Sequence, residues 1–237
     1  MISFYCGKDE SGIYGILYQI SSLSLIIWAA INNAFTPFLF EKLDKKDKCE
    51  TKKIAQISTG IILIYGFFSI IMTAVAPEIV FFLTNKQYFA AVYIIPPIAA
   101  GVFLTCIYNL FANIILYHKK TVGIMIATLF AAFINVGLNA IYIPKYGFQA
   151  AAYTTLIAFV VLSILQGVGM HYIHKEQLYE IKKITLISVV VICVCLSFNF
   201  VYSNWILRFV LIFLLFIIAI LFRTKIIGVI LQIKKRE

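Results

Sequence analysis

Charged residues are scarce in this chain. They make up 13% of its 237 residues, against about 25% in soluble domains. Hydrophobic residues make up 62%, including 21 Phe and 14 Tyr, and no soluble core of this length could bury so much apolar surface. The composition therefore excludes a soluble domain and indicates a polytopic membrane protein that lies in a lipid bilayer.

Sequence patterns for catalysis and for metal binding are missing as well. The sequence contains no H-E-x-x-H, no G-x-S-x-G, no phosphate-binding glycine loop and no pair of acidic residues within an apolar run. Its five cysteines form no C-x-x-C pair, and His118, His171 and His174 lie at the ends of apolar runs without metal-ligand partners in the sequence. We therefore expect no enzyme activity, no metal and no cofactor.

Seven apolar runs have roughly the 20 residues that a spanning helix needs. They are Ser11–Phe40, Ile54–Leu83, Phe89–Tyr117, Val122–Ile143, Phe148–Met170, Ile184–Tyr202 and Trp205–Ile233. We predict an all-α, polytopic membrane helix bundle of about seven transmembrane helices, forming one transmembrane domain over residues 1–237. Pro96-Pro97 lies inside the third run and predicts a kink there. Arg208, near the start of the seventh run, is expected to extend its guanidinium to the lipid headgroups.

The positive charge predicts how the chain is oriented in the membrane. The formal net charge is +10, but Lys and Arg lie in short loops, and no basic face carries stacking aromatics, so we expect no nucleic acid partner. Sixteen of the 20 Lys and Arg residues fall in alternate loops, namely Glu41–Lys53, His118–Thr121, His171–Lys183 and the segment from Arg223. By the positive-inside rule these loops are cytoplasmic, which places the N-terminus outside and the C-terminus in the cytoplasm.

The stretch Asn135–Val160 predicts a helical hairpin. Two apolar runs flank the sequence Ile143–Gly147, in which Pro144 hinders continuation of a helix and Gly147 readily adopts the backbone angles of a tight turn. Three alanines, Ala150–Ala152, open the second arm and are small enough to let another helix approach closely.

Polar side chains within the predicted spans are the best indication of a site, because hydrocarbon offers them no partners. Asn32 lies in the first run, Asn109 and Asn113 in the third, and Asn135 and Asn139 in the fourth. Each of the two pairs is spaced i, i+4 and projects from one side of its helix. Two interpretations stay open: these amides tie neighbouring helices together, or they line a hydrated cavity that binds sugar hydroxyls.

Several of these stretches resemble the polysaccharide transporter family, which contains the lipid-linked oligosaccharide flippases of O-antigen and capsule assembly. An apolar helix with N-x-x-x-N, followed by I-P-K-Y-G and an alanine-rich helix, is similar to the helix pair near the end of the proteins of that family. Gly12–Tyr14 and Trp28–Phe38 resemble its G-x-Y opening and its helix ending in P-F, and Pro77–Ile79 with Tyr88–Ala91 resembles its outer-side link. The family belongs to the superfamily that includes the MATE drug exporters and the lipid II flippases.

The resemblance implies a bacterial inner-membrane protein that translocates a polyprenyl-pyrophosphate-linked oligosaccharide for lipopolysaccharide O-antigen or capsule biosynthesis, by alternating access between two lobes. It covers the C-terminal lobe only, with Met1–Glu10 similar to a remnant of the helix that opens this lobe. We therefore expect the first lobe to be missing and a first-lobe polypeptide, or a second copy of the chain, to be a partner. The substrate-binding candidates are Asn32, Asn109, Asn113, Asn135, Asn139 and, for the pyrophosphate, Lys119 and Lys120.

Two other functions remain open at this point. One is a multidrug or ion exporter of the same superfamily. The other is a non-transporting membrane subunit that acts as a scaffold for a glycan-assembly complex.

Overall fold

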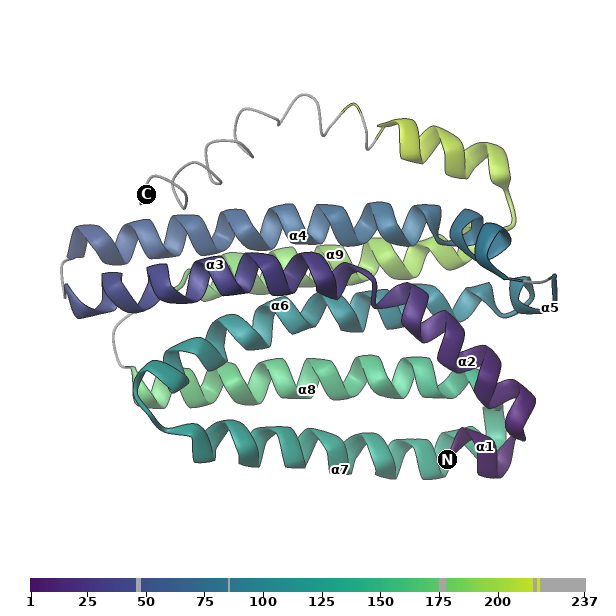
Figure 1. The fold of residues 1–237 in the computed structure, drawn as a ribbon, viewed down its shortest axis with the longest axis horizontal. Coiled ribbons are helices and arrows are strands. Elements are labelled where there is room, and N and C mark those ends of the chain that lie inside the picture. The colour runs from purple at the N-terminus through teal and green to yellow at the C-terminus, as the bar shows by residue number, and fades with distance from the viewer. Residues whose placement is uncertain (46–47, 85, 175–177, 215–216, 218–237) are drawn as a thin grey trace.

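The computed structural model describes residues 1–45, 48–84, 86–174, 178–214 and 217 (Figure 1). Helices make up most of this part of the chain, and it contains no strand. The elements are α1 (Ile2–Tyr5), α2 (Lys8–Ser21), α3 (Ser24–Asp44), α4 (Lys48–Leu83), α5 (Lys86–Phe89), the 3-10 helix η1 (Val92–Ile94), α6 (Ile95–Tyr117), α7 (Thr121–Tyr146), α8 (Gln149–Ile173), α9 (Ile181–Val201) and a short apolar helix at Trp205–Leu214. The predicted all-α membrane bundle is confirmed.

Five helices of the described residues are long and apolar enough to cross a bilayer: α4, α6 with its preceding 3-10 turn, α7, α8 and α9. The first predicted run is not one straight span, because α2 and α3 meet at a bend of 42° and supply a sixth span only as a pair. Of the seventh predicted run, Trp205–Leu214 is an apolar helix shorter than a span, and most of the remainder, 215–233, lies outside the described residues.

Two serines explain where the first run bends. The hydroxyl of Ser21 donates to the carbonyl of Leu17 at 2.7 Å, and the hydroxyl of Ser22 donates to the carbonyl of Tyr18 at 2.5 Å. Serine hydroxyls that bond back to the preceding turn compete with the backbone ladder and bend helices, and serine pairs are common sites of kinks. The break therefore follows directly after these residues.

The prolines lie elsewhere in their helices than the sequence predicts. Pro37, Pro77 and Pro144 are inside α3, α4 and α7, and each of these helices continues past its proline. Pro96 and Pro97 are in the first turn of α6, not at a kink within the span. Because the first N–H groups of a helix have no acceptor inside it, proline removes no hydrogen bond there.

The predicted hairpin is confirmed, with its turn at Gly147. The helix α7 continues through Pro144 to Tyr146, and Gly147 ends it with φ of 70°, in the region that glycine adopts most easily. Its N–H donates to the carbonyl of Ile143 at 2.9 Å, and α8 begins at Gln149. The two arms lie side by side along their length (Figure 1).

The core of the bundle surrounds α6, which packs against α8, α9 and α4. In its apolar stretch 83% of the residues are buried, against 11% in α7, which lies at the edge of the bundle and packs mainly on α8. Gly101 makes the α6–α8 contact close, because a Cβ at this position would come within 2.9 Å of Phe159. On the other side, Tyr65 of α4 is fully buried between Trp28 of α3 and Phe103 of α6.

Candidate functional site

A groove of about 860 Å³ opens between α2 and the α7–α8 hairpin, with Met1–Ser3 at one end. We call it the α2–α8 groove. Its polar lining is supplied by Ser11, Tyr14, Tyr18 and Gln19 from α2, Thr128, Asn135 and Asn139 from α7, and Thr155 from α8. Most of the lining is apolar. Apart from the chain terminus at Met1, none of the described lining residues carries a formal charge, so the polar groups that the groove offers to a ligand are hydroxyls and amides.

Asn135 and Asn139 both tie helices together and line the groove. The amide of Asn139 donates to the side-chain oxygen of Asn135 at 2.8 Å, and the hydroxyl of Thr154 donates to the side-chain oxygen of Asn139 at 2.5 Å. The amide of Asn135 also points to the hydroxyl of Thr155 at 3.5 Å. The two open interpretations of these residues therefore do not exclude each other.

Two aromatic rings form the opposite wall of the groove. Tyr14 and Tyr18 lie one helical turn apart on α2, with ring centroids 6.1 Å apart and planes inclined by 30°. Both are half-buried, so part of each ring remains open to the groove. The spacing of these tyrosines is visible in the sequence, but only the fold shows that they face Asn135 and Asn139.

The other predicted binding residues lie elsewhere. Asn113 on α6 is buried and donates its amide to the side-chain oxygen of Asn32 on α3 at 2.9 Å, which joins the two helices. Asn109, one turn earlier on α6, is half-buried and does not line the α2–α8 groove. The structure thus brings two of the five asparagines to the groove and pairs two others outside it.

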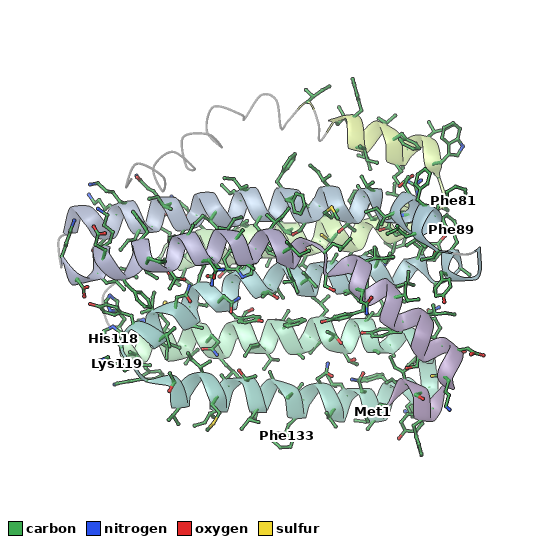
Figure 2. The ribbon with its side chains drawn as sticks, viewed as in Figure 1. Met1, Phe81, Phe89, His118, Lys119 and Phe133 are labelled. Carbon is green, nitrogen blue, oxygen red and sulfur yellow. The ribbon has the colours of Figure 1, made fainter. Side chains whose placement is uncertain are left out.

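Lys119 and Lys120 are exposed in the turn between α6 and α7, and Lys119 has a φ of 58°. At about 1.5 Å per residue, Lys120 is about 22 Å along α7 from Asn135. Figure 2 shows Lys119 and His118 at one end of the bundle and Met1 toward the other. The two lysines therefore belong to the rim at one end and do not meet the asparagines in one site.

Two histidines meet at this lysine-rich end, which the sequence did not predict. His118 follows the last residue of α6 and His174 follows the last residue of α8, with Nε2 of His118 at 3.0 Å from Nδ1 of His174. Burial lowers the pKa of His118, and so do the charges of His174 and Lys120. Both histidines do end apolar runs, but 56 residues separate them, so only the packing of α6 on α8 reveals the pair.

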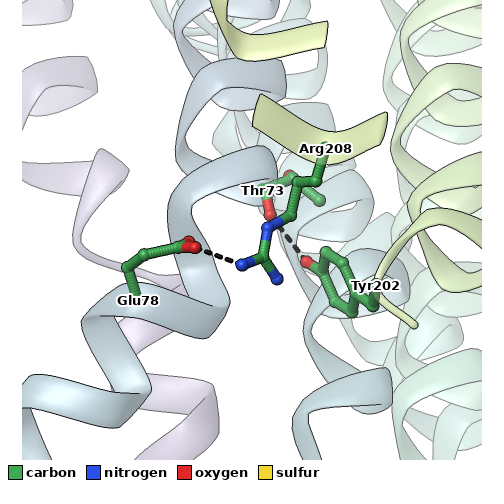
Figure 3. Close-up of polar contacts among 4 residues, drawn as sticks. All are labelled: Thr73, Glu78, Tyr202 and Arg208. Carbon is green, nitrogen blue, oxygen red and sulfur yellow. Dashed lines mark hydrogen bonds and ion pairs between the residues drawn. The ribbon is translucent and has the colours of Figure 1, made fainter. Parts of the chain in front are cut away.

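A buried ion pair joins α4 to the short helix after α9. Arg208 is 7% exposed and its guanidinium pairs with the carboxylate of Glu78 (Figure 3). Beside it the hydroxyl of Tyr202 donates to the carbonyl of Thr73 at 2.6 Å. The expectation that Arg208 extends to the headgroups is wrong, because a counter-charge lies within reach inside the bundle.

The amino-acid sequence of the chain is similar to known membrane proteins. Residues 1–141 of the chain match the MatE family. The chain is also similar to a Haemophilus influenzae protein named "Uncharacterized membrane protein", with 28% identity over 144 residues. That similarity covers 58% of this chain and 35% of the relative, so the chain spans about a third of the relative's length. No solved structure matches the chain.

Proposed function

The chain belongs to the MatE family of membrane transporters, and on that premise we propose that it translocates a lipid-linked oligosaccharide across a bacterial inner membrane, as one lobe of a flippase. The observation that supports this proposal is the α2–α8 groove, which presents amides, hydroxyls and two tyrosine rings within a largely apolar lining, with no charged side chain among its described lining residues. Sugars present many hydroxyls that such groups can hydrogen-bond, and their uncharged rings need no counter-ion.

The two exposed lysines fit a second part of such a substrate. A pyrophosphate linker is strongly anionic, and Lys119 and Lys120 lie at the end of the bundle that the positive-inside rule assigns to the cytoplasm. Because they lie about 22 Å from Asn135 along α7, they would bind the pyrophosphate when the substrate first arrives at the membrane surface. The asparagines would contact the glycan only after it has entered the groove.

A second polypeptide completes the site in this proposal. The chain spans about a third of its relative, and α7, which carries Asn135 and Asn139, is the least buried span among the described residues. Figure 2 shows Phe133 of α7 pointing away from the bundle, and its side chain is 74% exposed. A first-lobe polypeptide, or a second copy of this chain, would cover this face and close the groove from the other side.

The test is complementation of a strain that lacks its flippase, with this chain expressed together with a first-lobe polypeptide. We expect surface glycan to be restored by the wild-type chain. Two groove variants, Asn139→Ala and Tyr18→Leu, should each reduce it about fivefold to thirtyfold, the effect of losing one to two kcal/mol of binding. Asn33→Ala is the matched control, since Asn33 is exposed on α3 and outside the groove.

Three results would contradict the proposal. Export of hydrophobic cations without restored glycan would favour a multidrug exporter, in which Tyr14 and Tyr18 would bind a cation through their rings. Restored glycan that does not respond to the groove variants would show that the groove does not bind the glycan, and a failure to restore glycan would favour a scaffold subunit. Flipping of a fluorescent polyprenyl-linked sugar in liposomes by the monomeric chain alone would show that no second lobe is needed.

A further inference from the structure

A second groove, of about 960 Å³, lies where α8 and α9 both pack against α6. We call it the α8–α9 groove. Most of its lining is apolar, and two of its hydroxyls are already used within their own helices. Ser163 donates to the carbonyl of Phe159 and Ser188 to the carbonyl of Ile184, each at 2.8 Å. The groove therefore presents mainly a hydrocarbon surface to any ligand.

The length of the groove matches one leaflet of a bilayer. On α8 its lining extends from Val160 to Tyr172, which is about 18 Å at about 1.5 Å per residue. The hydrocarbon core of a bilayer is about 30 Å thick, so one leaflet takes about half of that. The groove begins near Tyr172 and Ile181, at the lysine-rich end of the bundle, and ends near Val160, about halfway along α8.

Charge at the mouth of the groove indicates the headgroup. Lys182 and Lys183 are exposed in the first turn of α9, next to the lining residue Ile181. Lys183 pairs with Glu180, so this turn carries a net positive charge. On the opposite wall His171 lines the mouth with its polar ring. Basic side chains at the level of the headgroups attract anionic lipids.

We propose that the α8–α9 groove binds the acyl chains of one anionic phospholipid from the leaflet at the lysine-rich end, with its headgroup against Lys182. The site is separate from the α2–α8 groove, since the two share no lining residue. Bound lipid fills the space that α8 and α9 leave over α6. This inference does not depend on which substrate the chain transports.

Native mass spectrometry of the purified full chain in detergent tests the proposal, with palmitoyl-oleoyl phosphatidylglycerol and the matching phosphatidylcholine as probes. We expect one phosphatidylglycerol to remain bound to the wild-type chain. Val189→Trp should abolish this adduct, because Val189 lines the groove, whereas Val190→Trp should keep it. The two valines are 52% and 50% exposed, which makes the second a matched control. Lys182→Gln should reduce the preference for phosphatidylglycerol about fivefold.

A second measurement needs no substitution. Phosphatidylglycerol with a photoactivatable group on an acyl chain should label peptides from Val160–Tyr172 and Ile181–Ile192 of the wild-type chain. Even labelling of all spans would overturn the proposal, as would equal lipid retention by the two tryptophan variants. Displacement by soluble glycerol phosphate would show that only the phosphate is recognised, and displacement by equimolar polyprenyl phosphate would assign the groove to the substrate. Either result would also overturn it.

Discussion

His118 and His174 hold the ends of α6 and α8 together through a single nitrogen-to-nitrogen contact of 3.0 Å. One ring must donate and the other accept, so the contact survives with at most one of the two rings protonated. Lys120 adds positive charge beside the pair, while the nearby Asp44 is already engaged with the hydroxyl of Tyr117 at 2.7 Å. The pair is therefore expected to weaken in acid.

The first prediction is a loss of stability as the pH falls from 7.5 to 5.5. The pKa of His118 is lowered in the folded chain, whereas in the unfolded chain this histidine has its ordinary pKa of about 6.5. As the pH falls, the unfolded chain therefore takes up the proton first. This uptake stabilises the unfolded state relative to the folded state. We expect the Tm of the purified chain in detergent to fall less over this interval in His118→Gln than in the wild type. His171→Gln, at an exposed position on α8, is the control, and equal pH dependence in all three proteins would refute the prediction.

The second prediction concerns the amide bridge between α3 and α6. Asn113→Ala removes the donor of the 2.9 Å bond and leaves the oxygen of Asn32 without it. Hydrogen bonds between membrane helices contribute about 0.6 kcal/mol on average and up to about 1.7 kcal/mol. We expect Asn113→Ala to lower the free energy of unfolding in mixed detergent by an amount within that range. The double variant with Asn32→Ala should add little further loss, whereas fully additive losses would show that the two amides are not coupled.

The third prediction concerns Glu78 and Arg208. Replacing one partner of a buried ion pair leaves the other charge unpaired, which destabilises proteins by about 3–5 kcal/mol. We expect Glu78→Gln to produce the larger fall in Tm, because it leaves the buried guanidinium of Arg208 without its partner. Arg208→Ala should produce a smaller fall, because the side chain of Glu78 is 24% exposed and solvent partly compensates for the lost partner. The exchanged pair, Glu78→Arg with Arg208→Glu, should recover part of the stability. A wild-type Tm in Arg208→Ala would mean that the pair does not hold the short helix on α4.

The fourth prediction is the orientation of the bundle in the membrane. In a variant without its natural cysteines, a cysteine at Lys145 should react with an impermeant thiol reagent added from outside. A cysteine at Lys182 should react only after the cells are opened, because the lysine-rich loops are predicted to be cytoplasmic. The reverse pattern would overturn the assignment of sides.

The sequence predicts the spans well, since a hydrocarbon environment demands long apolar helices with internally paired backbones. It predicts less well where those helices bend. Ser21 and Ser22 look unremarkable inside an apolar run, and their effect depends on hydroxyl bonds to the preceding turn. Proline alone does not predict a helix end here, because Pro37 and Pro144 each remove one hydrogen bond from a helix that nevertheless continues past them.

The candidate site could be predicted only in part. Asn135 and Asn139 stand out because amides within an apolar run are unusual and a spacing of four residues places both on one face. Their partner Thr154 is an ordinary residue in a membrane helix until α8 folds back on α7. Glu78 and Arg208 are 130 residues apart, and no local pattern connects residues at such a distance.

The long helix α4 has a practical consequence for imaging this molecule. Its 36 residues extend about 54 Å, well beyond a hydrocarbon layer of about 30 Å, and Figure 1 shows α3 and α4 projecting together past the ends of α6 and α8. A 26.9 kDa chain enclosed by a detergent micelle offers few landmarks for aligning particle images. This projecting pair offers an epitope for an antibody fragment, which would serve as a fiducial marker outside the micelle.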